Sequence, residues 1–373
     1  MSDQTTTLNF PGFVDVHVHF RDPGMTEAET TVSGLAAAAR GGFAAVVTMP
    51  NTAPACDSPE ALRRQVKVKA KGEGEQRTLL FPSACITKGR AGVEVADLEA
   101  LAEAGAAFFT DDGSYVADDK VMEEAMNRSA ALNMVVCQHA MDPVEQKGGV
   151  IRDCALARKL NLPVISVDTE TKAIRRDLSL CRTTGCRLHI QHISTAAGVT
   201  LVRDAQREGL PVTAEATPHH LLLTCDDLVA DDANFKMAPP LGNREDRAEL
   251  RKAVKDGVLM FATDHAPHPA AKKSLGFLKS ANGIIGLETA IPITYAVMVE
   301  EEGMSVDKWA EAWWKMPRWL LNANLANSTN CANEWPETKI EIGEERVVDV
   351  NSFASLSRNC PYHGMKGRCW PCN

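Results

Sequence analysis

The chain has 373 residues, of which 45% are hydrophobic and 24% are charged, a composition typical of a water-soluble globular protein with one large core or two ordinary ones. Its net charge of −9 argues against nucleic acid as a partner, because phosphate binding needs a basic surface. No apolar run approaches the ~20 residues of a membrane span, so a membrane is not an expected partner either.

Short β-rich runs alternate with longer helical patterns along most of the chain. The predicted strands, each with period-2 alternation or a short apolar run, are Phe13–His19, Phe43–Met49, Thr78–Cys85, Ala106–Thr110, Asn133–His139, Arg187–His192, Pro211–Ala216 and Leu259–Thr263. The predicted helices between them are Glu27–Arg40, Ser58–Lys71, Val95–Ala104, Asp119–Ala131, Thr169–Thr184, Ala197–Glu208 and Arg244–Asp256.

This alternation predicts an α/β fold, a (β/α)8 TIM barrel, because eight parallel strands with helices between them close into a barrel. An open doubly wound sheet is the alternative. It lacks its best support, because no Gly-x-Gly-x-x-Gly follows the first strand.

The barrel is predicted to span residues 1–325, followed by an irregular C-terminal extension over residues 326–373. Leu325–Trp335 is polar and loop-like, whereas Lys339–Phe353 has the pattern of one or two short strands. Asn359–Asn373 is rich in Gly, Pro and Cys. Its Cys369-Trp-Pro-Cys372 pair is a weak indication of zinc, because a second ligand pair is missing.

The 11 cysteines are odd in number and mostly lie in apolar segments, as Cys85, Cys137 and Cys181 do. This pattern favours reduced thiols over a disulfide framework. Met1–Phe10 has no apolar core of a signal peptide. We therefore expect a cytoplasmic enzyme.

The first predicted strand carries two histidines. Because side chains two apart on a strand point to the same side, His17 and His19 face one way, in alternation with Asp15. Arg21 and a Pro-Gly turn follow, so a cationic group lies beside the two imidazoles. Imidazole is the commonest side-chain metal ligand, and the pattern favours half of a metal site over a strand that holds two histidines by chance.

Polar side chains also end most of the other predicted strands. Active sites of such barrels lie at the C-terminal ends of the strands, so these side chains would meet at one mouth. They are His17 and His19 at strand one, Asn51 after strand two, Asp111 and Asp112 after strand four, His139 at strand five, His192 at strand six and Asp264 after strand eight.

These residue types suit a pair of divalent ions. The expected grouping is one ion on His17, His19 and Asp264, a second on His139 and His192, and a bridging carboxylate from Asp111 or Asp112. Imidazole and carboxylate ligands suit zinc, and also manganese or cobalt. Two such ions about 3.5–4 Å apart share a hydroxide and lower the pKa of its parent water toward ~7.

Taken singly, each ligand has a structural alternative. Asp112, which precedes a glycine, fits an Asx turn, and His139 fits a core histidine bonded to a backbone carbonyl. Ser194 and Thr195, which follow His192 closely, fit a helix cap. The metal interpretation is preferred because the residues recur at successive strand ends.

The other histidines receive lesser roles. His189 alternates out of phase with the ligand that ends its strand and is expected to face the barrel exterior. His219 and His220 either shape the site from behind the ligands or are structural. His265 is expected to support Asp264.

Six segments between about Pro11 and about Asn322 carry motifs in the order of a known family. They are Asp15–Gly24, Met49–Thr52, Phe109–Gly113, Gln191–Thr195, Ala214–His220 and Ala262–His268. On these motifs the chain resembles the dihydroorotases of the amidohydrolase superfamily, in their bacterial type I branch.

The resemblance implies a barrel that converts (S)-dihydroorotate and water reversibly to N-carbamoyl-L-aspartate, a step of de novo pyrimidine biosynthesis. It implies two zinc ions per subunit, with an aspartate between them where many superfamily members use a carboxylated lysine. The implied ligands are His17, His19, Asp112 and Asp264 for one ion and Asp112, His139 and His192 for the other. A hydroxide that bridges the metals would attack the ring amide, with Asp264 as general acid and base.

The substrate carries a carboxylate, so a cation is required near the metals. Arg21 fits, because guanidinium binds carboxylate through two parallel hydrogen bonds. The substrate-binding residues implied by the resemblance are His19, Arg21, Asn51, His268, Asn282 and Gly283, the last two through their backbone.

Related functions stay open at this point. Hydantoinases and dihydropyrimidinases process rings that lack the carboxylate, and their first motif lacks the arginine, whereas allantoinase is a closer alternative. A weakened homologue that serves as a scaffold for aspartate transcarbamoylase is a further alternative, disfavoured because all six ligand positions remain. The resemblance also implies a homodimer and, for some type I enzymes, docking on aspartate transcarbamoylase.

Three features depart from the family pattern. Only 16 residues precede His17, where relatives usually have several strands, so a small β-sandwich formed by the termini is expected to be truncated or missing, with residues 326–373 as its remnant. Ala238 stands where the family usually has an asparagine that contacts substrate, a loss of about 1–3 kcal/mol of binding. Asn282 replaces an aromatic residue. Pro267–Asn282 is expected to be a flexible lid, because part of it lacks a strong helical face.

Overall fold

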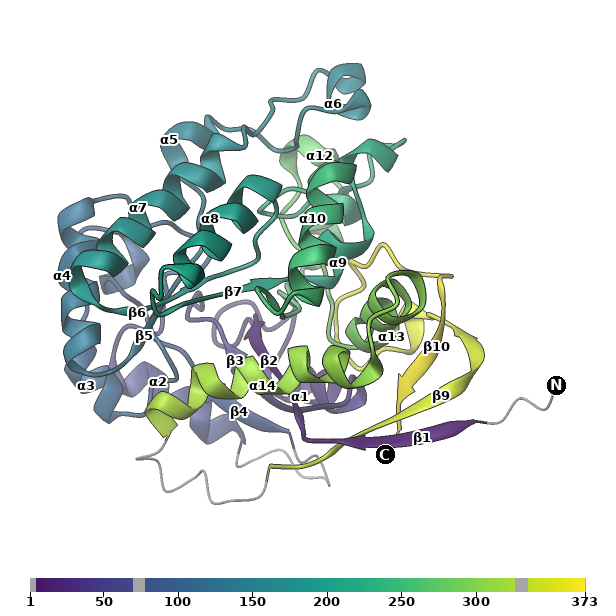
Figure 1. Cartoon of the computed structure of the whole chain (residues 1–373), viewed down its shortest axis with the longest axis horizontal. Coiled ribbons are helices and arrows are strands. Elements are labelled where there is room, and N and C mark those ends of the chain that lie inside the picture. The colour runs from purple at the N-terminus through teal and green to yellow at the C-terminus, as the bar shows by residue number, and fades with distance from the viewer. Residues whose placement is uncertain (1–4, 70–77, 326–334, 373) are drawn as a thin grey trace.

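The computed structural model of the chain describes residues 5–69, 78–325 and 335–372. Parallel strands form a barrel within a ring of helices, and a small antiparallel sheet lies beside it (Figure 1). Within the described ranges, no helix has both the length and the apolar character needed to traverse a bilayer.

Seven regular strands make up the barrel in two parallel sheets. The first sheet contains β2 (Phe13–Val18), β3 (Phe43–Thr48) and β4 (Leu79–Pro82). The second contains β5 (Val135–Gln138), β6 (Arg187–Ile190), β7 (Val212–Ala216) and β8 (Met260–Phe261). All residues of β2 and β3 are buried, as expected for strands covered on both faces.

Two short links join these sheets into a closed barrel. Phe109 pairs with Ala84 on one side and Val136 on the other, and Val18 pairs with His265. The predicted strand Ala106–Thr110 is therefore wrong as a regular strand, since it pairs through a single bridging residue. It still occupies the position of the fourth strand, and the (β/α)8 barrel is confirmed.

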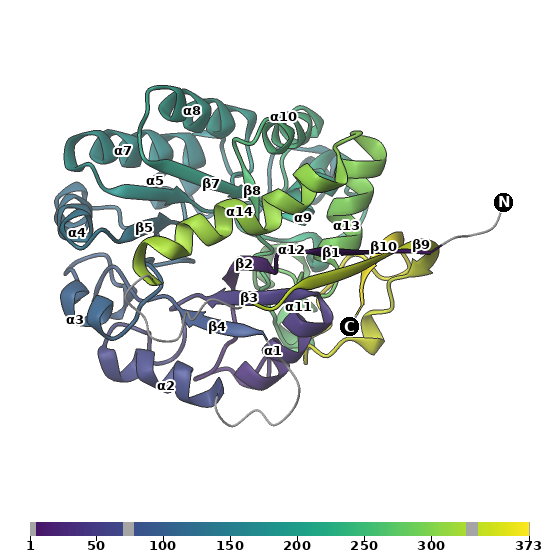
Figure 2. The same cartoon turned by 60° about the horizontal axis from the view of Figure 1, so that its bottom comes forward.

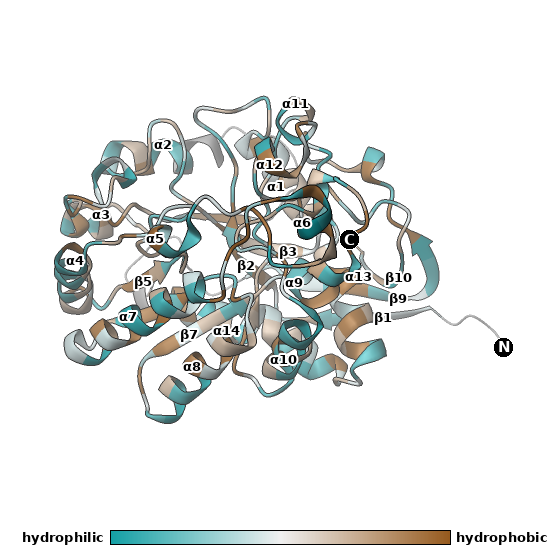
Figure 3. Ribbon diagram, turned by 90° about the horizontal axis from the view of Figure 1, so that it is seen from above, coloured by the Kyte–Doolittle hydropathy of each residue, from teal (hydrophilic) through white to brown (hydrophobic). Residues whose placement is uncertain are grey.

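The helices that the periodicity predicts surround the barrel. They are α1 (Thr31–Arg40), α2 (Pro59–Lys69), α3 (Leu98–Glu103), α4 (Asp119–Ala131), α7 (Asp168–Thr184), α8 (Ala196–Arg207) and α10 (Arg244–Lys255). Figure 3 shows hydrophilic and hydrophobic bands alternating along α7 and α8, as amphipathic helices require. The last two residues of the predicted Ser58–Lys71 helix lie outside the described residues.

Helix α1 begins four residues later than the sequence pattern predicts. Thr30 forms its N-cap, and the side chains and backbones of Thr30 and Ser33 make a reciprocal capping box. The preceding Glu29 is instead fully buried in contacts with distant segments. Capping therefore sets the start of this helix, where periodicity alone placed it at Glu27.

A long helix closes one end of the barrel. Helix α14 (Val306–Leu325) lies against β2 and β8 (Figure 2). Leu320 and Leu321 of this helix join a cluster with Val14 and Val47, whose positions alternate with those that face the outer helices. The interior of the barrel below its mouth is thus filled by apolar side chains, and the site is confined to the opposite end.

Short helices lie in the remaining connections. They are α5 (Pro143–Gln146), α6 (Ala155–Leu160), α9 (Pro218–Leu222), α11 (Ala270–Lys273), α12 (Gly276–Lys279) and α13 (Ala290–Thr294), with a π-helical turn at Tyr295–Glu301.

The two ends of the chain meet in one antiparallel sheet of order β1-β9-β10. Its strands are β1 (Thr6–Phe10), β9 (Thr338–Val347) and β10 (Lys366–Pro371). Where a truncated or missing β-sandwich was expected, the described residues form this three-stranded sheet (Figure 1). The predicted strand within Lys339–Phe353 is confirmed, whereas the stretch expected to be irregular contains β10. Most of the predicted Leu325–Trp335 loop lies outside the described residues.

Candidate metal centre

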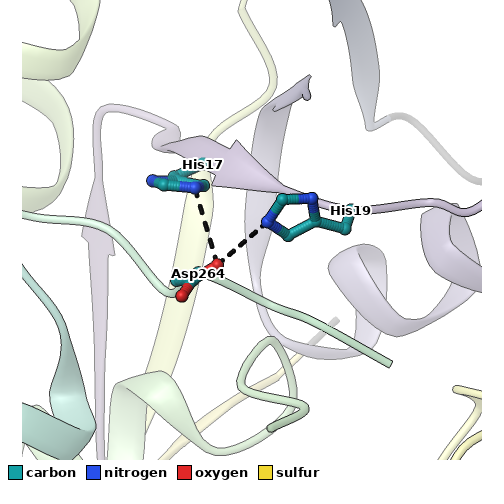
Figure 4. Close-up of side chains that lie close together, drawn as sticks. All are labelled: His17, His19 and Asp264. Carbon is teal, nitrogen blue, oxygen red and sulfur yellow. Dashed lines mark hydrogen bonds and ion pairs between the residues drawn. The ribbon is translucent and has the colours of Figure 1, made fainter. Parts of the chain in front are cut away.

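Four imidazoles and two carboxylates converge at the mouth of the barrel. Asp264 Oδ1 lies 3.0 Å from His19 Nε2 and 3.5 Å from His17 Nε2 (Figure 4). The two oxygens of Asp112 lie 3.3 Å from the same two imidazole nitrogens. The structure thus brings together four of the six predicted ligands, two imidazoles and two carboxylates.

The other two predicted ligands lie on the far side of Asp112. Its Oδ1 is 3.6 Å from His139 Nδ1 and 3.8 Å from His192 Nε2. These two imidazole nitrogens are 2.8 Å apart. Asp112 therefore lies between two pairs of histidines, the position that a bridging carboxylate requires.

Asp111, the other carboxylate of its pair, is turned away. It accepts hydrogen bonds from the backbone N–H groups of Ile86 and Thr87, at 2.8 and 3.1 Å, and from the Thr87 hydroxyl. Of the two aspartates that the residue pattern left open, Asp112 is the one that faces the imidazoles.

Three residues of the site have left-handed backbones without being glycine. They are Arg21, His192 and Asp264, with φ values of 29°, 32° and 48°. Such conformations cost about 1–3 kcal/mol each and persist only where the surroundings impose them. At Asp264 and His192 the chain leaves its strand in this conformation, which aims the side chain into the mouth.

Glu215 is a member of the site that the sequence reasoning missed. Its Oε1 lies 2.6 Å from His17 Nδ1 and its Oε2 lies 2.9 Å from His189 Nε2. Burial opposes a charged His17, but the carboxylates of Asp112, Glu215 and Asp264 raise the pKa of His17 well above its ordinary value. Despite its own burial, Glu215 has a pKa lowered to about 2, because His17 lies beside it. With a carboxylate at Nδ1, Nε2 is the nitrogen of His17 that faces Asp112 and Asp264, and a metal bound there would take the place of its proton.

The expectation that His189 faces the exterior is wrong. Its ring is buried, and Nδ1 lies 2.9 Å from the Thr213 hydroxyl. The error arises because alternation was counted back from His192, which follows β6 in a left-handed conformation and no longer obeys the strand period. The ring of His265, expected to support Asp264, lies 3.3 Å from Glu29 and accepts from the backbone N–H of Gly286 at 3.1 Å.

The donor set fits a metal site. His17 Nε2 and Asp112 Oδ1 are buried and have no hydrogen-bond partner, which is costly unless a further group satisfies them. Among the described residues, two triads bring their ligand atoms within 4.8 Å of one another: His17, His19 and Asp264, and His17, Asp112 and His192. Buried imidazole and carboxylate ligands of this kind suit zinc.

A cavity of about 260 Å³ opens beside these ligands. The predicted substrate residues that line it are His19, Arg21, Asn51, His268, Asn282 and Gly283. Ala238, the position where the family usually has asparagine, lines it too. The structure therefore places every predicted substrate residue around one cavity.

Arg21 and His268 lie together at this cavity. Arg21 Nη2 is 3.4 Å from His268 Nε2, and Arg21 Nε donates to the carbonyl of Pro267 at 3.2 Å. Burial lowers the pKa of Arg21 to about 10, so its charge persists at neutral pH. Burial, and then Arg21, lowers the pKa of His268 to about 3, and its neutral Nε2–H donates to the carbonyl of Asn282 at 2.7 Å.

The predicted lid segment carries helices α11 and α12 and is held by a buried lysine. Lys273 Nζ donates to the carbonyls of Lys236, Ala281 and Gly283 at 3.2, 3.0 and 2.9 Å. His220 Nε2 lies 3.1 Å from the carbonyl of Pro239, next to the cavity residue Ala238. Whether the segment closes over a ligand stays a prediction.

A parallel barrel with buried histidines and aspartates at its C-terminal mouth is typical of a metal-dependent enzyme. Residues 6–197 match the family model described as dihydro-orotase-like. The dihydroorotase of Geobacillus sp. (strain WCH70) is 41% identical over 362 residues, which cover 96% of this chain and 84% of the relative. That of Listeria innocua is 40% identical over 381 residues, 99% of this chain and 86% of the relative. The chain belongs to the dihydroorotase family.

Solved structures share the fold at lower identity. The L-hydantoinase of Arthrobacter aurescens matches with a TM-score of 0.79 and 24% identity, over 98% of this chain and 83% of that one. The dihydroorotase of Saccharomyces cerevisiae in complex with 5-fluoroorotic acid matches with a TM-score of 0.74 and 18% identity, over 98% of both chains. These likenesses support the barrel.

Proposed function

We propose that this chain catalyses the reversible hydrolysis of (S)-dihydroorotate to N-carbamoyl-L-aspartate. The observation that carries the proposal is the position of Arg21, whose guanidinium lines the same cavity as Asp112 and Asp264. A buried cation beside a metal-type centre suits a cyclic amide that bears a carboxylate. A neutral hydantoin ring carries no negative charge with which this cation could pair.

The centre would hold two zinc ions. One would bind His17, His19, Asp112 and Asp264, and the other would bind Asp112, His139 and His192. Bound there, the ions would polarise the ring amide carbonyl and make water a nucleophile near neutral pH. The buried, unpartnered Nε2 of His17 and Oδ1 of Asp112 support this assignment.

Asp264 is the group that moves the proton. Its burial favours the neutral acid, but His17 and His19 hold the pKa of Asp264 below its ordinary value, so it is a carboxylate at neutral pH. It accepts a proton from the attacking water and returns it to the ring nitrogen as the C–N bond breaks. The reverse reaction uses the same proton in the opposite direction.

Arg21, Asn51 and His268 would bind the substrate carboxylate. Asn51 Oδ1 is 2.9 Å from His19 Nδ1, so the Asn51 amide nitrogen is left to donate to a ligand. The backbone around Asn282 and Gly283 would hold the ring, and His19 would contact the substrate as well. The carboxylate anchor fixes the amide carbonyl toward the metal centre.

Ring opening of dihydroorotate and ring closure of N-carbamoyl-aspartate, measured on the zinc-loaded protein, test this proposal. Hydantoin, dihydrouracil and allantoin serve as comparison substrates of the same reaction type. We expect kcat/KM for dihydroorotate to exceed that for every neutral ring by at least about 100-fold. Faster turnover of allantoin or hydantoin would favour the related hydrolases, and no turnover above background would favour a scaffold.

The family resemblance supports further proposals about assembly and location. We expect the chain to form a homodimer. We also propose that it binds aspartate transcarbamoylase, as some type I enzymes do. All cysteines in the described part of the chain are free thiols, which supports a cytoplasmic location. Light scattering of the protein alone and mixed with aspartate transcarbamoylase tests both assemblies.

A further inference from the structure

The C-terminal tail reaches the rim of the substrate cavity. Between β9 and β10, this tail lies against the segment that follows Arg21. The Ser355 hydroxyl and the Leu356 N–H donate to Glu29, and the Ser357 hydroxyl donates to the carbonyl of Ala28 at 2.7 Å. These bonds fix the tail beside the site from the side of β2.

Asn359 extends the same tail to the other side of the cavity. Its Nδ2 donates to the carbonyls of Ala266 and Gly283 at 3.0 and 3.1 Å. Its Oδ1 accepts from the backbone N–H of His268 at 3.1 Å. The residue is only 4% exposed, and its own carbonyl accepts from Ile285 N–H at 3.0 Å.

All three partners of the Asn359 amide line the substrate cavity, whereas Asn359 itself does not. Ala266 and His268 belong to the loop after β8, and Gly283 lies beyond helix α12. One side chain therefore ties together two walls of the cavity. An amide suits the position, because it offers two N–H donors and an acceptor within one planar group.

The hydrogen bonds of Asn359 act on the part of the cavity that is proposed to bind the substrate carboxylate. His268 Nε2 lies 3.4 Å from Arg21 Nη2 and donates to the carbonyl of Asn282, the neighbour of Gly283. Without the Asn359 amide, the buried carbonyl of Ala266 and the N–H of His268 lose their side-chain partner, and the carbonyl of Gly283 keeps only Lys273 Nζ. The two walls also lose their common anchor. Binding sites tolerate only about 0.5 Å of such displacement.

We propose that Asn359 is a positioning residue that sets the geometry of the substrate-carboxylate pocket from the C-terminal tail. It acts through His268 and Gly283 and does not touch the substrate. This inference deepens the proposed function and rests on it for the identity of the ligand.

Steady-state kinetics with dihydroorotate on zinc-loaded protein test the proposal. Asn359→Asp sets a carboxylate oxygen against two carbonyls, and Asn359→Ser replaces the amide with a shorter hydroxyl that cannot reach all three partners, without adding charge. We expect KM to rise about tenfold in both, the equivalent of ~1.4 kcal/mol, while kcat changes less than about threefold and bound zinc is unchanged. Ser357→Ala, which removes a hydrogen bond of the same tail on the β2 side, is the matched control and should keep the wild-type KM.

Amide hydrogen exchange supplies a readout that needs no substrate. In the Asn359 variants we expect faster exchange at His268 and Ile285, and unchanged exchange in β2–β4. A KM within about twofold of wild type in a folded variant, or activity that falls only with the folded fraction, would overturn the positioning role. If Asn359→Asp does not fold, Asn359→Ser decides.

Failure of the positioning role and failure of the proposed function give different results. If the wild type opens dihydroorotate and the Asn359 variants have the same KM, the positioning role of Asn359 is rejected and the proposed function stands. A wild-type protein without turnover rejects the function. Hydrogen exchange then decides the role of Asn359, and unchanged exchange at His268 rejects it.

Discussion

Nδ1 of His17 lies 2.6 Å from Oε1 of Glu215, although the two residues are 198 positions apart in the chain. The carboxylate holds the proton of His17 at Nδ1 and leaves Nε2 toward Asp112 and Asp264. Glu215 thus acts on the proposed metal centre through the orientation of one of its ligands.

Substitution Glu215→Gln tests this relationship. The amide keeps the size of the side chain but removes the charge that orients His17, so we expect zinc affinity to fall by about 10–100-fold. Competition with a chelator measures it. Glu208→Gln, at an exposed ion pair with Arg182, is the control and should bind zinc as the wild type does. Equal affinity in the Glu215 variant would contradict the assigned role.

Asp264→Asn separates metal binding from proton transfer. Five ligands remain, so we expect the variant to keep at least one zinc ion per chain. It loses the base, and the rate of ring opening should fall by at least about 100-fold. Metal analysis and a dihydroorotate assay on the same sample measure both effects, with exposed Asp256→Asn as the control. Full activity would remove Asp264 as the proton carrier.

Arg21→Ala tests carboxylate recognition. Hydrogen bonds to a charged group contribute about 1.5–3 kcal/mol, so kcat/KM for dihydroorotate should fall by roughly 10–150-fold. Any turnover of a neutral hydantoin should change little, because that ring has no carboxylate. Arg21→Lys keeps the charge but loses the planar pair of donors. Its kcat/KM for dihydroorotate should lie between those of the wild type and of Arg21→Ala. An equal loss on both rings would show that Arg21 does not read the carboxylate.

Ala238→Asn tests the departure from the family pattern at the cavity wall. Ala238 lines the cavity, so an amide there gains access to the substrate. We expect tighter binding of dihydroorotate by about 1–3 kcal/mol, seen as a lower KM at similar kcat. A higher KM would mean that the neighbouring side chains have already taken the space of that amide.

Lys273 predicts a pH dependence of stability that does not involve the metal centre. Burial lowers the pKa of Lys273 to about 7 from 10.5 in the unfolded chain. Between these values the unfolded chain binds the extra proton, so this group makes the protein more stable as the pH rises, by up to about 1.4 kcal/mol per unit. Below pH 7 both states are protonated and the effect ends.

Lys273→Met removes that contribution. The stability of the wild type relative to the variant should therefore rise with pH between 7 and 10.5, as chemical denaturation at several pH values measures. Lys272→Met, the exposed neighbour, should show no such trend. A wild-type to Lys273→Met difference that is independent of pH would contradict the lowered pKa.

The strand ends were predictable because a chemical and a geometric pattern coincide there. His17 lies in β2 and His19 just beyond its end, with both imidazoles toward Asp264. Asp264 and His192 follow strands that the apolar runs mark clearly. A barrel then brings these ends together without any further information. That argument does not reach Glu215, which lies inside β7, because a buried carboxylate within a strand gives no local sign of its partner.

Other features depended on contacts that local patterns do not encode. The fourth strand position is formed by Phe109 alone, which makes one β-bridge to Ala84 and one to Val136. His189 faces Glu215 from within β6, and counting the alternation back from His192 misplaced it because His192 lies beyond the strand in a left-handed conformation. Asn359 contacts the loop after β8 only because the tail packs there in the folded protein. A polar residue in a stretch that contains Gly and Pro gives no local sign of this contact.

The proposed function requires that ring opening depend on bound metal. Zinc content per chain and dihydroorotate turnover, measured together during stepwise chelation and zinc return, test it directly. We expect two ions per chain, loss of turnover as zinc is removed, and recovery when zinc is restored. Undiminished ring opening by protein stripped of metal would contradict it.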